Sequence, residues 1–183
     1  TQKNLNLNLL FSRGCQCGQL EVVQWLWSLG EINLHYDHDL AFRYSCIFGH
    51  LEVAQWVWSL GGVNLHYDND YAFQSACEKG HLELAQWLWS LGGVNPHYGN
   101  DYVFRRTCVN GHLGVAQWLW SLGEINFHYD NDYTFRCSCT YGHLEVVQWL
   151  WSLGDVNLHA NEDGAFRYSC INGHLEVAQW LVT

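Results

Sequence analysis

Residues 49–61 of the 183-residue chain read GHLEVAQWVWSLG. This stretch recurs with few changes, and the other copies start at Gly18, Gly80, Gly111, Gly142 and Gly173. Each copy starts 31 residues after the one before it, as positions 49 and 80 show. A fixed period of this length indicates supersecondary units that stack on one another, so the sequence predicts a repeat protein.

The repeated stretch is predicted to form a helix, which we call the long helix of each repeat. At about 100° per residue, Glu52, Gln55 and Ser59 fall on one narrow polar stripe, and apolar residues cover about half of the circumference. A helix this apolar needs neighbours on more than one side, and stacked copies would supply them. We expect Gly61 to end the helix as a left-handed cap and Gly49 to allow a tight turn before it.

A second pattern precedes the long helix. Residues 39–46 read DLAFRYSC, which predicts a short helix with Asp39 as its N-cap. Phe42 and Cys46 lie one turn apart and give this short helix an apolar face that can pack closely. Residues 62–69 follow the long helix and have the composition of a tight polar loop.

Charge and composition exclude several classes of protein. The net charge is −10 and only eight residues are Lys or Arg, whereas nucleic acids and anionic membranes are bound by clustered cations. No apolar run approaches the length of a membrane-spanning helix, and no signal peptide is visible. The sequence has no Met, even at position 1, so we expect it to be a piece of a longer or processed chain.

Six of the eight cysteines occupy the same position in successive repeats. They are Cys15, Cys46, Cys77, Cys108, Cys139 and Cys170. Packed helices lie about 8–10 Å apart, whereas a disulfide needs Cα atoms within about 7 Å. We therefore expect reduced, buried thiols and an intracellular protein. Cys137 lies outside this column and is expected to face solvent, either as a reactive thiol or as an ordinary surface residue.

The sequence resembles the ankyrin-repeat family over nearly its whole length. The resemblance is carried by Gly-His-Leu-Glu-Val, then apolar residues, then Gly-x-Val-Asn. It implies an all-α helical repeat solenoid of antiparallel helix pairs, short projecting fingers, and protein binding on the concave face of short helices and fingers. The 31-residue form is similar to repeats of large DNA viruses of amoebae and of some protists, which would place a viral copy in the host cytoplasm. We expect residues 1–183 to form a single array of about six repeats, incomplete at both ends.

Two ladders of histidines resemble metal ligands at first sight. One contains His50 and His81 and the other contains His35 and His66. Metal ligands must converge on one ion, but members of one ladder lie a whole repeat apart, near 10 Å. We therefore expect hydrogen-bonded histidines and no metal, although a site that joins His66 to Cys or Asp stays open.

Two further motifs resemble a calcium loop and a catalytic Cys–His pair, but their details favour structural roles. Residues 68–70 read DND, similar to the start of a calcium loop, but the Gly and the distant Glu of that loop are missing, so we expect turn and capping roles. A Cys–His nucleophile needs one special pair, whereas these residues occur in near-equal copies. We predict no enzyme activity, no cofactor and no small-molecule substrate.

The Trp56 column borders the polar stripe of the long helix. Its rings either lie flat on the next repeat as packing or form a partly exposed stripe for docking or self-association.

The repeats also align with one another, so columns that vary can be read directly. Three varying columns and an arginine column are expected on the exposed side of the short helix. The predicted partner-binding residues are Arg43, Tyr44, Gln74, Glu78, Arg105, Arg106, Arg136, Tyr141, Arg167 and Tyr168. Tyr and Arg are frequent in interfaces, although neutral drift at solvent positions would give the same variation.

These observations predict a non-catalytic protein–protein interaction module. Arg105, Arg106 and Tyr141 lie in the middle of the array and are expected to contribute most. The negative charge favours a protein partner with basic patches, and excludes nucleic acid and membrane as partners. Two alternatives stay open: a structural spacer or self-assembling array, and a substrate-recruiting arm of a larger enzyme or ligase adaptor.

Overall fold

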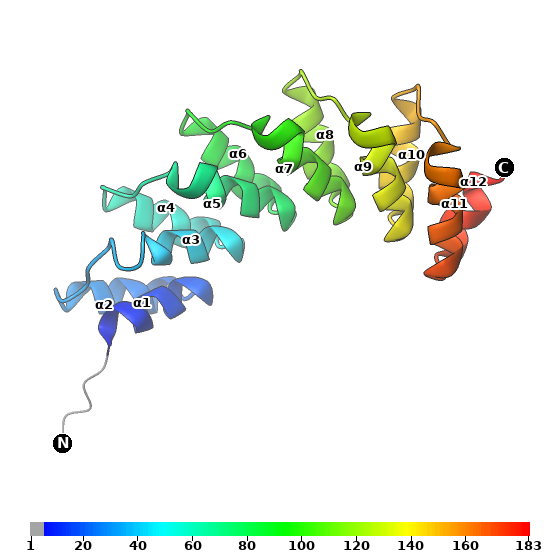
Figure 1. The fold of residues 1–183 in the computed structure, drawn as a ribbon. Helices are drawn as coiled ribbons and strands as arrows, with labels where there is room; N and C mark the ends of the chain where they lie inside the picture. The colour runs from blue at the N-terminus through cyan, green and yellow to red at the C-terminus, as the bar shows by residue number, and fades with distance from the viewer. Residues whose placement is uncertain (1–5) are drawn as a thin grey trace. The chain divides into compact units, whose positions relative to one another are not determined.

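The chain is described here by a computed structural model of residues 6–183, so residues 1–5 of the expected array lie outside the described residues. These residues form α-helices and no strand, which confirms the all-α helical repeat fold (Figure 1). Internal contacts divide the chain into unit 1, residues 1–95, and unit 2, residues 96–183. The helices of unit 1 are α1 (Leu7–Gln16), α2 (Leu20–Ser28), α3 (Leu40–Ile47), α4 (Leu51–Ser59), α5 (Tyr67–Glu78) and α6 (Leu82–Ser90). The helices of unit 2 are α7 (Tyr98–Val109), α8 (Leu113–Ser121), α9 (Tyr129–Thr140), α10 (Leu144–Ser152), α11 (Ala160–Ile171) and α12 (Leu175–Leu181).

Short and long helices alternate, and within each unit the helix pairs lie side by side (Figure 1). Helices α3 and α4 differ little in length, with eight and nine residues. The short helices α5, α7, α9 and α11 span 12 residues because their bounds include the left-handed turn at the start. Gly61 has φ of +85° and its N–H donates to the Trp58 carbonyl at 3.0 Å, which confirms the left-handed cap of the long helix.

The core of each repeat is an aromatic cluster around the phenylalanine of the short helix. Phe42 is buried, and its ring lies 5.8 Å from Trp58 of the same repeat and 6.3 Å from Trp87 of the next. Trp58 and Trp87 meet edge to face at 88°. The Trp56 column, to which Trp87 belongs, therefore packs on the preceding repeat and does not lie flat on the next. Most of its members are half-buried, and Trp25 is 61% exposed.

A left-handed turn leads into each short helix from α3 onward. Asp68, Asn69 and Asp70 have φ of 48°, 56° and 65°, a region that Asn and Asp tolerate better than other side chains. The predicted turn role of residues 68–70 is confirmed. Asp39 stands at the predicted N-cap position of α3, but its side chain makes no hydrogen bond to the N-terminus of that helix, so the expected capping bond is absent.

The aspartate carboxylates join neighbouring repeats. In unit 1, Asp39 Oδ1 lies 2.8 Å from His35 Nδ1, and its Oδ2 accepts the backbone N–H of Asn64 in the next repeat at 3.0 Å. In unit 2, Asp132 pairs with His128 at 2.6 Å and accepts the N–H of Asn157 at 2.8 Å. The carboxylate binds a neighbouring repeat and does not serve as a cap, because the left-handed turn directs it there.

The other histidine ladder also connects repeats. His81 Nε2 lies 3.2 Å from the Ile47 carbonyl, and a Cβ on Gly49 would lie 2.5 Å from the His81 ring. Gly49 is thus required by the approach of the next repeat as well as by its φ of +80°. The predicted hydrogen-bonding role of both ladders is confirmed.

The cysteines of the column are buried except for the last one. Five thiols of the column are buried as expected, and Cys170 is exposed. Burial raises the pKa of Cys15 and Cys139 to about 12. Cys137 is half-buried, and burial raises its pKa while a hydrogen bond with Tyr133 opposes the rise. Cys137 is therefore only partly exposed to solvent, and a thiol with a raised pKa is a poor nucleophile.

Candidate protein-binding face

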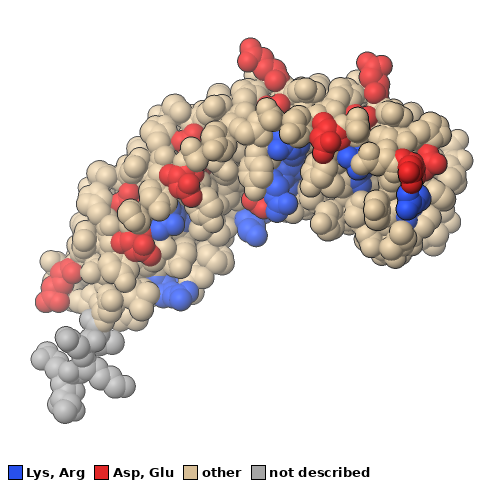
Figure 2. Space-filling model, in the orientation of Figure 1, with Lys and Arg blue, Asp and Glu red and all other residues tan. Residues whose placement is uncertain are grey.

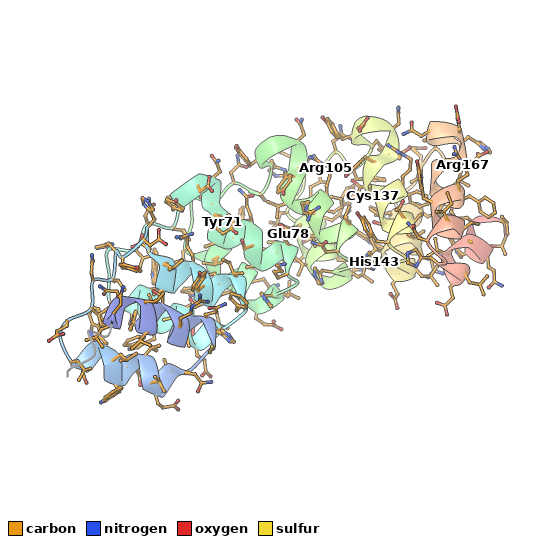
Figure 3. All side chains as sticks on the ribbon, turned by 60° about the horizontal axis from the view of Figure 1, so that its bottom comes forward. Tyr71, Glu78, Arg105, Cys137, His143 and Arg167 are labelled. Atoms are coloured by element: carbon orange, nitrogen blue, oxygen red, sulfur yellow. The ribbon has the colours of Figure 1, made fainter. Side chains whose placement is uncertain are left out.

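The predicted binding residues belong to the short helices or directly follow them, and we call the side of the short helices that carries them within each unit the short-helix face. Arg105, Cys137 and Arg167 come from α7, α9 and α11 in unit 2 (Figure 3). Tyr141, directly after α9, is 57% exposed, and Tyr168 on α11 is also exposed. The other predicted residues divide into half-buried and exposed. Arg167 is exposed. The half-buried residues are Arg43, Tyr44, Gln74, Glu78, Arg105, Arg106 and Arg136.

The arginine column holds the left-handed turn of its own repeat. Arg136 Nε–H donates to the Asn131 carbonyl at 2.9 Å, and its Nη2 donates to the Asp130 carbonyl at 3.0 Å. Gln74, which interrupts the arginine column, donates to Asn69 in the same manner. These bonds satisfy carbonyl groups that the left-handed turn leaves outside the helix. This structural role was not predicted from the sequence.

Two arginines of this column, Arg43 and Arg105, also contact tyrosines of the following repeat. The guanidinium of Arg105 lies 4.8 Å from the centre of the Tyr129 ring and donates to the Gly99 carbonyl at 3.2 and 3.3 Å. In unit 1, the guanidinium of Arg43 lies 4.9 Å from the Tyr67 ring. Cation–π contacts of this kind orient the guanidinium across the junction between two repeats.

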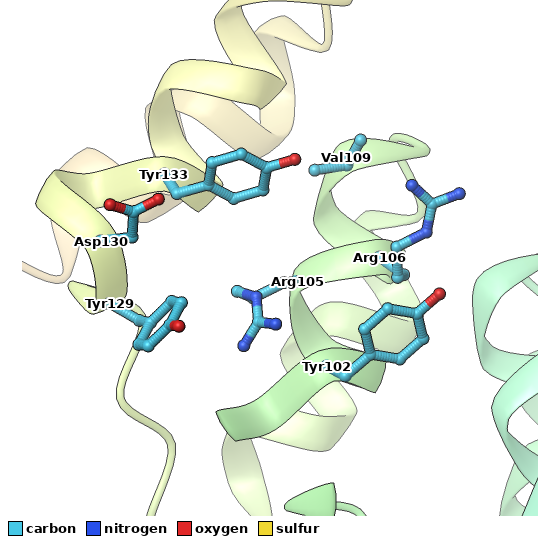
Figure 4. A pocket seen from close by; sticks show the side chains of 7 residues that line it. All are labelled: Tyr102, Arg105, Arg106, Val109, Tyr129, Asp130 and Tyr133. Carbon is cyan, nitrogen blue, oxygen red and sulfur yellow. The ribbon is translucent and has the colours of Figure 1, made fainter. Parts of the chain in front are cut away.

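A pocket of about 250 Å³ opens between α7 and α9 (Figure 4). Its walls carry two guanidinium groups, three phenol rings, one aliphatic side chain and one carboxylate. The lining residues are Tyr102, Arg105, Arg106, Val109, Tyr129, Asp130 and Tyr133. Concave sites with apolar walls and a few polar groups are where proteins bind ligands or protruding side chains.

The structure brings together two of the three residues expected to contribute most. Arg105 and Arg106 line the pocket, and Tyr141 lies outside its lining. Tyr129 and Tyr133 are not among the residues predicted from the sequence, because both belong to columns that recur in several repeats, as packing residues do. Their absence from the last repeat, where Ala160 and Gly164 replace them, was the available signal.

Both acidic and basic residues lie on the surface of each unit. Figure 2 shows Asp and Glu atoms at projecting tips and along each unit, with Lys and Arg atoms beside several of them. Glu124 and Asp155 occupy loop tips of unit 2 with positive φ and are exposed. Among residues 6–183, no group of three or more His, Cys, Asp or Glu is placed to hold a metal ion. No helix in this described part is both long and apolar enough to cross a membrane.

Comparison with known proteins places this architecture. Residues 125–182 match a family model whose description is "Ankyrin repeats (many copies)". The crystal structure of the human ASB11 ankyrin repeat domain superposes with a TM-score of 0.70 over 94% of this chain and 81% of that one, at 17% sequence identity. The chain has the ankyrin-repeat fold. Ankyrin repeats are in general protein–protein interaction modules that bind protein partners. No curated protein matches the sequence significantly.

Proposed function

We propose that this ankyrin-repeat chain is a non-catalytic protein–protein interaction module that binds its partner on the short-helix face. The supporting observation is a contrast between columns. Side chains that pack the repeats, such as Phe104 and Phe135, are the same and are fully buried. Side chains on the short-helix face differ from repeat to repeat, as Arg106 and Cys137 do. We further propose an intracellular location, because the cysteines are free thiols.

Arg105, Arg106 and Tyr141 are proposed to contribute most of the binding free energy. Tyr141 offers a large exposed ring with few rotatable bonds, and interface energy is concentrated in Tyr, Trp and Arg. Arg105 is already oriented by Tyr129 and the Gly99 carbonyl, so little conformational entropy remains to be lost when it binds.

The partner is proposed to carry basic patches that face the acidic loop tips and turns. The net charge of −10 raises the rate of encounter with a basic protein. Glu124→Gly and Asp155→Gly remove two charges at positions where Gly62 and Gly93 stand in other repeats. Their combination is expected to slow association and to make binding less sensitive to salt. Unchanged association kinetics would contradict the basic-patch proposal.

Site-specific photo-crosslinking tests the binding face. A photoreactive phenylalanine analogue is placed at Tyr141 on the short-helix face or at Gln148, an exposed residue of the long helix α10. In a cell lysate, a discrete adduct is expected from position 141 and none from position 148. An adduct from position 148 alone would contradict the placement of the site.

A pull-down with the double variant Arg105→Glu/Tyr141→Ala gives the second test. The partner is expected to be lost by this variant. Because Glu at position 105 would also face the Gly99 carbonyl, the companion variant Arg105→Gln/Tyr141→Ala keeps an amide donor, as Gln74 does in its own repeat. A partner retained equally by both variants would refute the proposed residues.

A further inference from the structure

The α7/α9 pocket differs in charge from the rest of the chain. Two of the eight Lys and Arg residues line it, against the single carboxylate of Asp130, in a protein whose net charge is −10. Figure 4 shows Arg105 and Arg106 on α7 and Tyr129 and Tyr133 on α9, on opposite sides of the opening. The pocket is thus a locally basic site with aromatic walls.

Two adjacent arginines occur once in the sequence, at positions 105 and 106. Helices α9 and α11 have the same length and the same left-handed turn as α7, but Cys137 stands in place of the second arginine. The α9/α11 junction also lacks both tyrosines, since Ala160 and Gly164 occupy their positions. In unit 1, the α3/α5 junction keeps the tyrosines but has Tyr44 where α7 has Arg106. The combination of paired arginines and tyrosine rings therefore belongs to the α7/α9 junction.

The chemistry of the lining selects an anionic occupant. A guanidinium group has five N–H donors, and Arg105 uses two nitrogens on a single acceptor, the Gly99 carbonyl. Carboxylates form charge-assisted, often bidentate hydrogen bonds with such groups. A lysine or arginine side chain would instead be repelled by both guanidinium groups. Because Asp130 already lies in the lining beside the two arginines, an occupant with one negative charge fits the site better than one with several.

The size of the pocket suits one side chain. A volume of about 250 Å³ accommodates an extended acidic side chain whose methylene groups lie against the tyrosine rings and Val109. We propose that the α7/α9 pocket binds the carboxylate of an aspartate or glutamate from an acidic segment of the partner protein. This inference rests on the proposed interaction function and adds the chemistry that the pocket recognises.

Selection from a random heptapeptide display library on the full chain tests the proposal. Selected peptides are expected to be enriched in Asp and Glu. A synthetic copy of the best peptide is expected to lose affinity at least about tenfold, by fluorescence anisotropy, when its acidic residue is changed to the corresponding amide. Arg106→Ser is expected to cause a similar loss. Enrichment of Lys and Arg, or no enrichment of acidic residues, would overturn the proposal.

The other repeats supply matched variants. Arg106→Ser places at position 106 the residue that Ser75 provides in the same column, and Arg105→Gln copies Gln74 and keeps a donor for the turn. Arg13→Ser removes an arginine from the same column of unit 1 and is expected to leave peptide affinity unchanged. Urea unfolding and circular dichroism check that each variant is folded.

The outcomes separate the pocket from the wider proposed function. A peptide that binds Arg106→Ser as well as the parent chain, but loses affinity with Tyr141→Ala, would overturn the pocket and leave the short-helix face as the binding surface. If no selected peptide depends on any short-helix residue, both proposals are wrong.

Discussion

The two helix junctions of unit 2 share one core and differ on one surface. At the α7/α9 junction and at the α9/α11 junction, a phenylalanine of the short helix is fully buried, as Phe104 and Phe135 show. In both, a carboxylate accepts the backbone N–H of the next repeat, from Asn126 to Asp101 and from Asn157 to Asp132. Only α7/α9 combines paired arginines with tyrosines. The stacking columns therefore leave the surface columns free to differ, which is what a binding scaffold requires.

Removal of the buried aromatic ring is the strongest test of the shared core. Phe104→Ala is expected to lower the free energy of unfolding by about 3–5 kcal/mol, because the ring packs between Trp120 and Trp149. Phe166→Ala, at the same position of the last described repeat, should cost about 1 kcal/mol because Phe166 is 39% exposed. Urea titrations measure both values. Equal losses would mean that the core is not built between repeats.

Two equivalent glycines separate the cost of a steric contact between repeats from the cost of backbone strain in the turn. Gly111 and Gly173 both have positive φ, so alanine costs about 1–2 kcal/mol at either position. A Cβ on Gly111 would also lie 2.4 Å from His143, whereas nothing lies within 4 Å of one on Gly173. Gly111→Ala is therefore expected to cost about 1–3 kcal/mol more than Gly173→Ala in urea unfolding. A smaller loss for Gly111→Ala would contradict close stacking.

The aspartate whose carboxylate joins two repeats has an equivalent in the last described repeat, which serves as its control. The side chain of Asp132 is 6% exposed and bonds both His128 and Asn157. The side chain of Asp163 is 57% exposed and bonds His159. Asp132→Ala is expected to lower thermal stability by the equivalent of about 1–3 kcal/mol, and Asp163→Ala by well under half of that. Similar shifts in melting temperature would show that the bond to the next repeat contributes little.

The smallest expected effect concerns pH. Burial lowers the pKa of His143 below its usual 6.5, against a hydrogen bond to the Val109 carbonyl that raises it, and His174 lowers it further. The unfolded chain then takes up a proton more readily than the folded one. The contribution of His143 is therefore complete above pH 6.5 and is lost as the pH falls below 6.5 through the lowered pKa. His143→Gln, which copies Gln19, serves as the reference that cannot titrate.

The measurement is the difference in urea midpoint between the two chains at several pH values. The stability of the parent chain relative to His143→Gln should fall as the pH decreases from 7 to 5. A constant difference would mean that the ring is not desolvated between the repeats.

Repetition made the packing predictable from the sequence. Because the chain aligns with itself, Phe42 and Cys46 could be assigned to a buried face and Gly61 to a left-handed cap, and all three assignments are confirmed. Periodicity fixes which positions share an environment, and burial follows from that alone.

The left-handed turn and the pocket could not be predicted from the repeat pattern of the sequence. Asp39 suits an N-cap and also suits a partner of the histidine four residues earlier, and only the left-handed backbone of the turn decides between these roles. The pocket joins Arg105 to Tyr129 across two repeats, so neither residue predicts it alone. A column that recurs in most repeats conceals a residue that also lines the pocket, as Tyr129 does.

The α9/α11 junction can receive a copy of the pocket. A Cβ on Gly164 would meet Asn161 at 3.5 Å and Arg136 at 3.7 Å, which are ordinary contacts. The same column holds Tyr71, Tyr102 and Tyr133 in other repeats. Cys137→Arg, Ala160→Tyr and Gly164→Tyr therefore rebuild the lining with residues that the fold already accepts.

The most direct test moves the pocket from one junction to the other. Arg106→Ser/Tyr129→Ala empties the α7/α9 site, and Cys137→Arg/Ala160→Tyr/Gly164→Tyr builds it between α9 and α11. The affinity of the selected acidic peptide, measured by anisotropy, is expected to fall at least about tenfold in the emptied chain and to recover in the chain that carries all five changes. A folded five-residue variant that does not bind the peptide would contradict the claim that surface columns alone set recognition on a common scaffold.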